Sequence, residues 1–215
     1  EASKDNWKLC EDCQRRMQEE GLESVDELQS YMIHRIEEYL NSKGRQIIGW
    51  DEILQGGLAP NATVMSWRGE EGGIAAAAAG HDAIMSPHAY CYIDAPQDAP
   101  PTQPEAIGGY LPLEKVYSYE PAPKSMDANV ANHIKGVQAN LWAEFIPTDE
   151  HYEMMLWPRA IALAEIAWSH PGKNGAKDYA NFRERAVNIV ERMTEEGYAP
   201  FDLKSEIGER PESRE

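Results

Sequence analysis

Indole and carboxylate side chains recur together where short apolar segments of this chain end. "VQANLWAEF" carries Trp142 and Glu144 two residues apart, and "QIIGWDEIL" carries Trp50 and Glu52 at the same spacing. Residues two apart in an extended chain point to one face, so each indole would stand beside a carboxylate. Such pairs suit a carbohydrate, because sugar C–H faces stack on aromatic rings and carboxylates accept hydrogen bonds from hydroxyls.

Two further segments carry this pattern in a looser form. "TVMSWRGE" ends its apolar run at Trp67, and "YCYIDAP" contains Tyr92 and Asp94. Ligand sites of α/β barrels gather at the C-terminal ends of the parallel strands, where all these residues would stand. The competing interpretation is that each indole fills core volume and each acid caps a following helix. Four recurrences favour a binding rim over packing alone.

The elements that would position these residues alternate between helix and strand. We expect helices over residues 7–21, 24–44, 70–80, 149–169 and 179–197, and strands over 46–50, 62–67, 82–86 and 136–142. Strands that are apolar throughout and alternate with helices indicate a parallel sheet covered by helices. The predicted fold class is therefore α/β.

Residues 24–44 carry the clearest helical signal. Ser24 and Glu27 form a capping box, and Gly44 suits the position just after the helix. Apolar residues recur at steps of three and four, which predicts one apolar stripe along the helix. The stripe consists of Val25, Leu28, Met32, Ile36 and Leu40.

Residues 94–123 are rich in Pro and Gly and lack helical periodicity. Irregular segments of this length usually form lids or binding loops, and we expect one here. No low-complexity linker divides the chain, so we predict one domain over residues 1–203 and a polar C-terminal tail over 204–215.

Composition excludes several classes of partner. The 215 residues have a formal net charge of -17, which argues against nucleic acid and anionic membranes. No apolar run approaches the roughly 20 residues that span a bilayer. No P-loop, dinucleotide fingerprint or histidine cluster is present, so we expect no metal and no cofactor.

Three cysteines, Cys10, Cys13 and Cys91, leave at least one thiol unpaired within a monomer. "CEDC" has the spacing of redox and zinc sites, but no second pair follows at zinc-ribbon distance. We expect an ordinary structural role, with a local disulfide or an incomplete metal site as open alternatives.

Other polar residues are predicted to be structural. Glu52 would brace the rim, and the acids before the Ala-rich helix would favour its dipole. The remaining structural assignments cover Glu70, Glu71, His133, His151, Arg159 and Glu165.

Three long segments resemble the β-N-acetylhexosaminidases, which are glycoside hydrolases that use substrate assistance. They are "GRQIIGWDEILQGGLAPNATVMSWRG", "IGGYLPLEKVYSYEP" and "GVQANLWAEFIPTDEHYEMMLWPRAIALAEIAW". The resemblance implies the C-terminal half of a (β/α)8 TIM barrel, about strands 5 to 8. It also implies that Glu1 is the Glu of the family's Asp-Glu pair, with the catalytic Asp upstream of this chain.

The resemblance further implies hydrolysis of terminal non-reducing N-acetylhexosamine (GlcNAc or GalNAc) through an oxazolinium intermediate. Glu1 would be the acid and base, and the Tyr92 hydroxyl would donate to the acetamide carbonyl. The other implied contacts are an acetamido pocket walled by Trp50, Trp67 and Trp142, and sugar hydroxyls bound by Asp94 and Glu144.

The implied partners are N-acetylhexosamine-containing glycans, and the implied location is secreted, periplasmic or lysosome-like. A half-barrel exposes sheet edges, so we expect pairing with a missing N-terminal half-barrel or self-association as a dimer. The alternative function is a non-catalytic carbohydrate-binding or scaffold module that keeps the aromatic rim.

Overall fold

Four strands form one sheet in chain order, β1-β2-β3-β4. β1 pairs in parallel with β2, and β2 pairs in parallel with β3. The expected α/β class with a parallel sheet is confirmed. The strands are β1 Ile48–Trp50, β2 Thr63–Ser66, β3 Ala83–Met85 and β4 Ile134–Val137.

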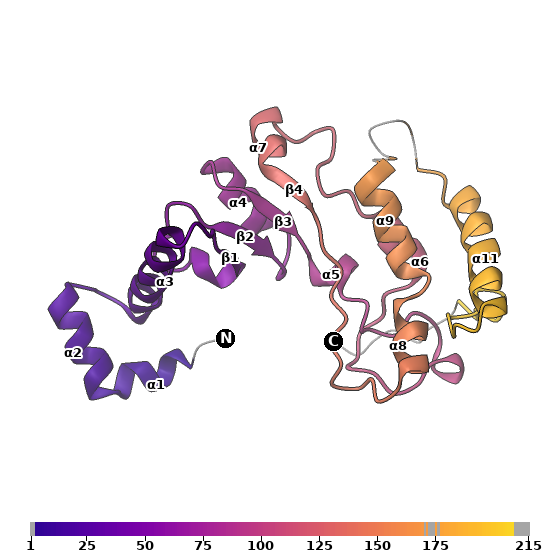
Figure 1. Ribbon diagram of the computed structural model, residues 1–215, viewed down its shortest axis with the longest axis horizontal. Coiled ribbons are helices and arrows are strands. Elements are labelled where there is room, and N and C mark those ends of the chain that lie inside the picture. Colours follow the sequence, from indigo (N-terminus) through magenta and orange to yellow (C-terminus); the bar gives the residue numbers. More distant parts are fainter. Residues whose placement is uncertain (1–2, 170, 172–174, 176, 209–215) are drawn as a thin grey trace. The chain divides into compact units, whose positions relative to one another are not determined.

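This computed structural model describes residues 3–169, 171, 175 and 177–208. Residues 209–215 of the predicted tail lie outside that range. The chain divides into two compact units (Figure 1). The first comprises Glu1–Met85 and Asp127–Lys135, and the second comprises Ser86–Met126 and Gly136–Glu215.

A small core lies beside β2 in the first unit, which also contains the following helices. They are α1 Lys4–Leu9, α2 Glu11–Glu20, α3 Val25–Ser42, the 3-10 helix η1 Asp51–Leu54, α4 Glu71–Ala78 and α7 Ala128–His133. Val64 of β2 packs with Ile53 and Ala76, and Ile33 of α3 packs against that cluster. Gly73 lets α4 approach the sheet, because a Cβ there would lie 2.6 Å from Met85 Sδ.

The capping expected at the start of α3 is present. Ser24 Oγ accepts from the Glu27 backbone N–H at 3.2 Å, and the Glu27 carboxylate accepts from the Glu23 N–H at 2.8 Å. Gly44 follows the helix with φ of +69°, as the C′ position favours.

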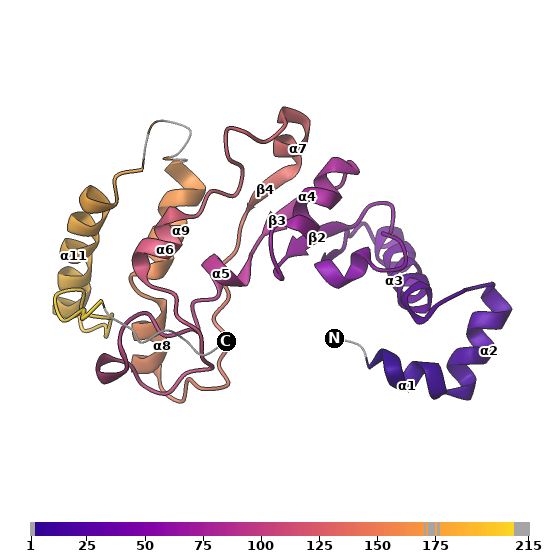
Figure 2. The ribbon, with the colours of Figure 1, turned by 180° about the vertical axis from the view of Figure 1, so that it is seen from behind.

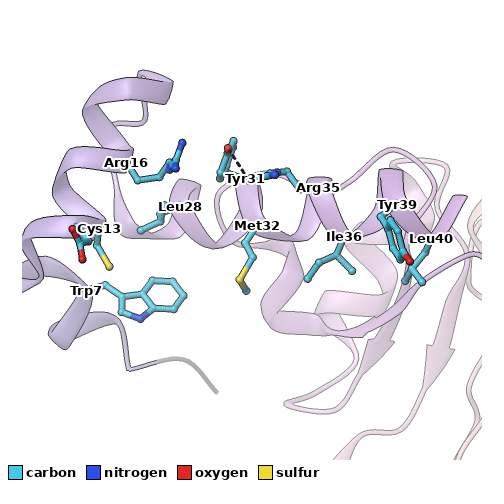
Figure 3. Close-up of a pocket in the computed structure, with 11 residues that line it drawn as sticks. Trp7, Cys13, Arg16, Leu28, Tyr31, Met32, Arg35, Ile36, Tyr39 and Leu40 are labelled. Atoms are coloured by element: carbon cyan, nitrogen blue, oxygen red, sulfur yellow. Dashed lines mark hydrogen bonds between the residues drawn. The ribbon is translucent and has the colours of Figure 1, made fainter. Parts of the chain in front are cut away.

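The apolar stripe of α3 is partly exposed. Met32 is 46% and Ile36 is 43% exposed, whereas Gln29, Ser30 and Glu37 are buried. The stripe lines a hollow of about 710 Å³ beside α1 and α2 (Figure 3). The predicted apolar stripe is present, and four of its members, Leu28, Met32, Ile36 and Leu40, share this one face.

Buried polar side chains explain the orientation of α3, because they satisfy backbone groups of the following loops. Gln29 Nε2 donates to the carbonyl of Glu52 at 2.8 Å. Glu37 accepts from the backbone N–H of Asn61 at 2.7 Å. A buried carboxylate that receives a backbone N–H recovers much of its lost hydration.

The single helix expected over residues 7–21 is two helices. Cys10 adopts an extended conformation with φ of -79° and ψ of 118°, between α1 and α2. The Gln14 N–H donates to the Cys10 carbonyl at 3.0 Å, which starts the hydrogen-bonding pattern of α2.

Apart from the end of β4, the regular elements described in the second unit are helices (Figure 2). Its helices are α5 His88–Cys91, the 3-10 helix η2 Pro100–Thr102, α6 Leu113–Ser118, α8 Asp149–Leu156, α9 Arg159–Ser169 and α11 Tyr179–Glu195. α6 falls inside the segment expected to be irregular and buries Leu113 and Val116. It packs against α9 and α11.

The helix expected over residues 149–169 is interrupted at Pro158, which separates α8 from α9. Proline lacks an N–H and its ring clashes with the preceding turn, so the α8 ladder cannot continue through it. None of the helices in the described ranges combines the length and the apolar character that crossing a membrane needs.

Candidate functional site

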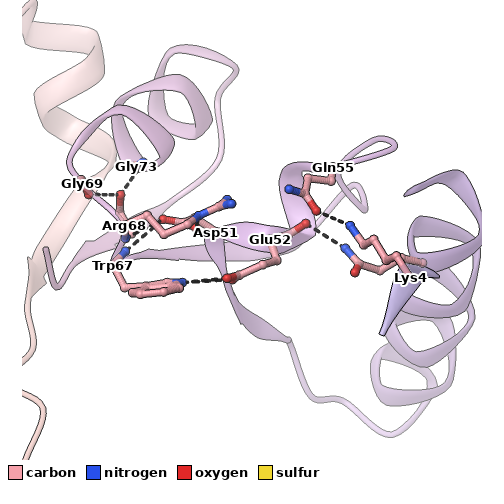
Figure 4. A network of polar contacts seen from close by, with 10 residues as sticks. Lys4, Asp51, Glu52, Gln55, Trp67, Arg68, Gly69 and Gly73 are labelled. Atoms are coloured by element: carbon pink, nitrogen blue, oxygen red, sulfur yellow. Dashed lines mark hydrogen bonds and ion pairs between the residues drawn. The ribbon is translucent and has the colours of Figure 1, made fainter. Parts of the chain in front are cut away.

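Trp50 and Trp67 lie at the C-terminal ends of adjacent strands in the first unit. Trp50 is the last residue of β1, and Trp67 directly follows β2. The Trp67 indole N–H donates to both carboxylate oxygens of Glu52, at 3.0 and 3.1 Å (Figure 4). The bracing role predicted for Glu52 is confirmed.

Asp51 organises the turn that follows β2, and sequence reasoning missed it. Its side chain is buried and accepts from the backbone N–H groups of Trp67 at 3.0 Å and Arg68 at 3.2 Å. It also pairs with Arg68 Nε at 2.5 Å. The sequence feature that could have identified Asp51 is an acid directly after an apolar strand. At that position it can reach the loop that follows the neighbouring strand.

Tyr92 lies beside the chain segment that follows β4 in the second unit. It forms an isolated parallel bridge with Asn140. The Ile93 N–H donates to the Asn140 carbonyl, and the Asn140 N–H donates to the Cys91 carbonyl, both at 2.9 Å. The chain turns directly after this bridge at Ile93 and Asp94.

These placements correct two expectations about strands. β4 ends at Val137, so Trp142 lies in the loop five residues beyond it rather than in the strand. The segment that carries Tyr92 begins as α5 and continues as a bridge, not as a full strand. The buried Asn140 side chain donates to Ser86 Oγ at 2.7 Å, which anchors the bridge.

Tyr92, Asp94 and Trp142 line one hollow of about 360 Å³ in the second unit. Residues 107–111 form part of its wall, so the segment expected to be a binding loop does contribute to it. His88 also lines it, with its ring perpendicular to that of Tyr92 at 6.3 Å between centroids. An aromatic wall with a single acid is the composition expected of a site for a polar, ring-shaped ligand.

Burial raises the pKa of Asp94, whose residue is only 5% exposed. Its own backbone N–H, the Arg159 charge and the Trp142 backbone N–H lower the pKa, and the charge of Glu144 raises it. The carboxyl group therefore sits between a buried cation and an exposed anion.

Arg159 is fully buried and holds the chain on both sides of Asp94. Its guanidinium donates to the carbonyls of Ile93 at 2.5 Å and Ala95 at 2.6 Å. It also reaches the carbonyls of Leu111 at 3.1 Å and Met155 at 2.8 Å. Burial lowers the pKa of Arg159 to about 9, and Asp94 opposes this shift. The buried bracing role predicted for Arg159 is confirmed.

The structure thus brings together three of the predicted site residues. Glu144 is exposed and does not line the hollow, although its charge acts on Asp94. Trp50 and Trp67 belong to the other unit, and Glu1 lies outside the described residues.

The remaining polar residues have structural partners or packing. Glu165 accepts from the Tyr117 hydroxyl and pairs with Arg185 at 2.6 Å. His133 Nδ1 lies 3.0 Å from Asp82. Burial lowers the pKa of His151. Glu70 and Glu71 stand at the start of α4, as expected.

Within the described ranges, no group of three or more His, Cys, Asp or Glu side chains could hold a metal ion.

Comparison with known proteins matches residues 1–171 to the catalytic domain of glycosyl hydrolase family 20. A beta-hexosaminidase of Porphyromonas gingivalis is 50% identical over 198 residues, which cover 92% of this chain and 25% of the relative. A beta-hexosaminidase of Vibrio furnissii is 34% identical over 161 residues, covering 74% of this chain and 26% of that protein.

A solved structure of a family 20 enzyme has a similar fold. The family 20 exo-β-N-acetylglucosaminidase of Vibrio harveyi, crystallised with N-acetylglucosamine, superposes with a TM-score of 0.78 at 28% identity. The match covers 90% of this chain and 30% of that one. The chain spans about a quarter of the length of the first two relatives, and the fold is that of TIM-barrel family 20 enzymes.

Proposed function

Because the chain belongs to glycosyl hydrolase family 20, we propose that it supplies part of the active site of a β-N-acetylhexosaminidase. The proposed reaction removes terminal non-reducing N-acetylhexosamine, GlcNAc or GalNAc, from glycans. The Vibrio harveyi relative was crystallised with such a sugar, which supports this substrate class.

The observation that carries the proposal is the hollow shared by Tyr92, Asp94 and Trp142. Its volume of about 360 Å³ suits a single sugar ring, at the small end of ligand pockets. Trp142 is 44% exposed, so its ring face is accessible for stacking. A half-exposed indole beside a buried carboxylate has little value for packing and much for binding a sugar.

In the proposed mechanism the substrate's own acetamido oxygen attacks the anomeric carbon as the glycosidic bond breaks. Glu1 gives its proton to the leaving oxygen, and an oxazolinium ion forms. Water then attacks the anomeric carbon, and Glu1 takes a proton from that water. The oxazolinium ring opens, and the anomeric carbon keeps its original configuration. An Asp upstream of this chain would orient the acetamide.

Residues of the second unit would bind the sugar and its acetamido group. The Tyr92 hydroxyl would donate a hydrogen bond to the acetamide carbonyl oxygen. This oxygen carries a partial negative charge and is the atom that attacks the anomeric carbon. Asp94 and Glu144 would accept hydrogen bonds from sugar hydroxyls. Since burial raises the pKa of Asp94, a hydroxyl that donates to it would stabilise its charged form.

Trp50, Trp67 and Trp142 would wall the acetamido pocket. Support comes from the bracing of Trp67, whose indole N–H is held by Glu52 and whose backbone N–H is held by Asp51. A preorganised aromatic wall loses less entropy on binding than a mobile one.

We further propose that the chain forms the C-terminal half of the barrel, about strands 5 to 8. The sequential order of the four strands and the parallel pairing of β1, β2 and β3 support this. Residues 1–203 would be barrel and 204–215 a tail. The complete active site would then need the N-terminal half-barrel or another copy of the chain.

The test is binding of a GlcNAc-thiazoline, a mimic of the oxazolinium, to the purified 215-residue chain by calorimetry. We expect saturable binding that Trp142→Ala weakens at least about tenfold, since truncating a tryptophan at the centre of a binding site costs about 2 kcal/mol or more. Trp168→Ala is the matched control, because Trp168 is 87% exposed on α9 and does not line the hollow.

Equal effects of the two tryptophan substitutions, or no binding, would contradict the proposed site. Hydrolysis of nitrophenyl β-N-acetylglucosaminide is measured in parallel. We expect little turnover by this chain alone and turnover when the remaining barrel is supplied. Binding without turnover in both cases would instead support a non-catalytic carbohydrate-binding module.

A further inference from the structure

Cys10 and Cys13 occupy one turn at the start of α2. Cys10 is the N-cap residue, in an extended conformation, and Cys13 is the third residue of the helix. The side chain of an N-cap residue and that of the third helical residue meet across the first turn, as in a capping box. Disulfides join residues whose Cα atoms lie about 4.4–6.8 Å apart. The first turn of α2 therefore presents two thiols at a separation that a small rotation can close.

The environment distinguishes the two thiols from each other. The backbone N–H of Cys13 and then its thiol lower the pKa of Cys10, with a smaller contribution from the backbone N–H of Asp12. The Cys10 thiol raises the pKa of Cys13. Helix N-termini stabilise thiolates in this way, because their first N–H groups lack carbonyl partners.

Solvent accessibility distinguishes this pair from the third cysteine. Cys10 and Cys13 are free thiols of intermediate exposure, whereas Cys91 is fully buried in the second unit. Cys13 lines the hollow beside α3 together with Trp7, as Figure 3 shows. A thiol reagent from solvent can thus reach the α2 pair and not Cys91.

We propose that Cys10 and Cys13 form a reversible dithiol–disulfide site, in which Cys10 reacts first and Cys13 resolves. With a low-molecular-weight disulfide as oxidant, the Cys10 thiolate attacks one sulfur and releases one thiolate. The Cys13 thiolate then attacks the Cys10 sulfur, forms the Cys10–Cys13 bond and releases the second thiolate. The two protons of the protein thiols pass to the released thiolates, and two electrons reduce the oxidant.

The resulting bond would lock the break between α1 and α2. Cys10 is the residue at which the chain leaves one helix and enters the next. Gln14 Nε2 already donates across this break to the Trp7 carbonyl at 3.1 Å. Oxidation would add a covalent link at the same corner of the hollow.

The experiment treats the reduced 215-residue chain with oxidised glutathione and follows it by intact mass and peptide mapping. Wild type should lose two hydrogen atoms and keep no glutathione, with the link mapped to Cys10 and Cys13. Cys13→Ser should retain one glutathione on Cys10, because the resolving thiol is gone. Cys91→Ser is the matched control and should oxidise like wild type.

Iodoacetamide labelling of the wild-type chain provides a second measurement that needs no substitution. Cys10 should react faster than Cys13, because its lowered pKa gives it the larger thiolate fraction, and Cys91 should react only after unfolding. Glutathione retained on wild type, or equal labelling of Cys10 and Cys13, would overturn the proposal. Either result would leave the proposed glycosidase function untouched, because none of its site residues takes part.

Discussion

Asp51 is the residue on which the turn after β2 depends. It is 2% exposed and is the acceptor for two backbone N–H groups and one guanidinium. Asp51→Ala should lower the free energy of unfolding by about 2–4 kcal/mol, since it leaves buried donors without an acceptor. Urea unfolding followed by tryptophan fluorescence measures this loss.

Arg68 supplies the matched control for Asp51. Its side chain is 45% exposed, so Arg68→Met removes an ion pair that solvent already screens. We expect a cost of at most about 1 kcal/mol. If both substitutions cost the same, the ion pair rather than the two backbone hydrogen bonds would stabilise the turn.

Residue types and spacing predicted much of the candidate site, and their limits are physical. Tyr92, Asp94 and Trp142 share a hollow because each stands where an apolar segment ends. Asp51 has the same residue type as a helix-capping acid, and only the path of the β2 loop reveals its two backbone partners. Long-range partners of this kind have no local signature.

At the scale of elements, Arg159 joins the start of α9 to the segment that carries Asp94. Arg159→Met should destabilise the chain by about 3–5 kcal/mol, because buried carbonyls and Asp94 lose their partner. Arg159→Lys keeps the charge but not the planar fork. It should retain the fold and weaken thiazoline binding, which calorimetry would detect.

Arg185→Met is the control for the substitutions at Arg159. Arg185 pairs with Glu165 between α11 and α9, and its side chain is 48% exposed. Its removal should change unfolding by at most about 1 kcal/mol and leave ligand binding unchanged. Unchanged thiazoline affinity in Arg159→Lys would contradict a role in positioning Asp94.

Asp98 ties the C-terminal segment to the loop that follows Asp94. It is fully buried and accepts from the N–H groups of Ile207 at 3.0 Å and Gly208 at 2.8 Å. Burial alone would raise the pKa of Asp98, but hydrogen bonds from the Thr102 hydroxyl and these N–H groups lower it. The carboxylate is therefore the form that the fold stabilises.

The lowered pKa of Asp98 makes the stability of the fold depend on pH. A lowered pKa gives stabilisation that is present above the ordinary Asp range of about 3.9 and is lost as pH falls through the folded-state pKa. Asp98→Asn should lower the melting temperature at neutral pH. The difference from wild type should shrink as pH falls below the ordinary Asp range of about 3.9, because the carboxylate is then lost in wild type. A difference that is constant with pH would show that Asp98 acts through packing alone.

Hydrophobic periodicity predicts that a helix is present better than it predicts where the helix ends or what packs against it. The helix at 25–42 formed as expected, yet its apolar stripe is partly exposed while Gln29, Ser30 and Glu37 are buried. Periodicity identifies an apolar face but not what covers it. Pro158 divides the helix expected at 149–169, and tertiary contacts with α9 create α6 in a segment without helical pattern.

For the whole molecule, the exposed stripe of α3 predicts association. Met32 and Ile36 line an apolar hollow of about 710 Å³, and Tyr39 beside them is 63% exposed. Exposed apolar patches on this scale mark interaction surfaces. We expect the chain to self-associate through this face.

Size-exclusion chromatography with light scattering over a range of concentrations tests that expectation. The molar mass of wild type should rise with concentration above that of the monomer. A double substitution, Met32→Glu with Ile36→Glu, should return it to the monomer, because two charges in an apolar contact are costly to desolvate. Ile189→Glu is the control, since Ile189 is 37% exposed on α11 in the other unit and should leave association unchanged. A monomer at every concentration, or equal effects of the two variants, would exclude α3 as the associating surface.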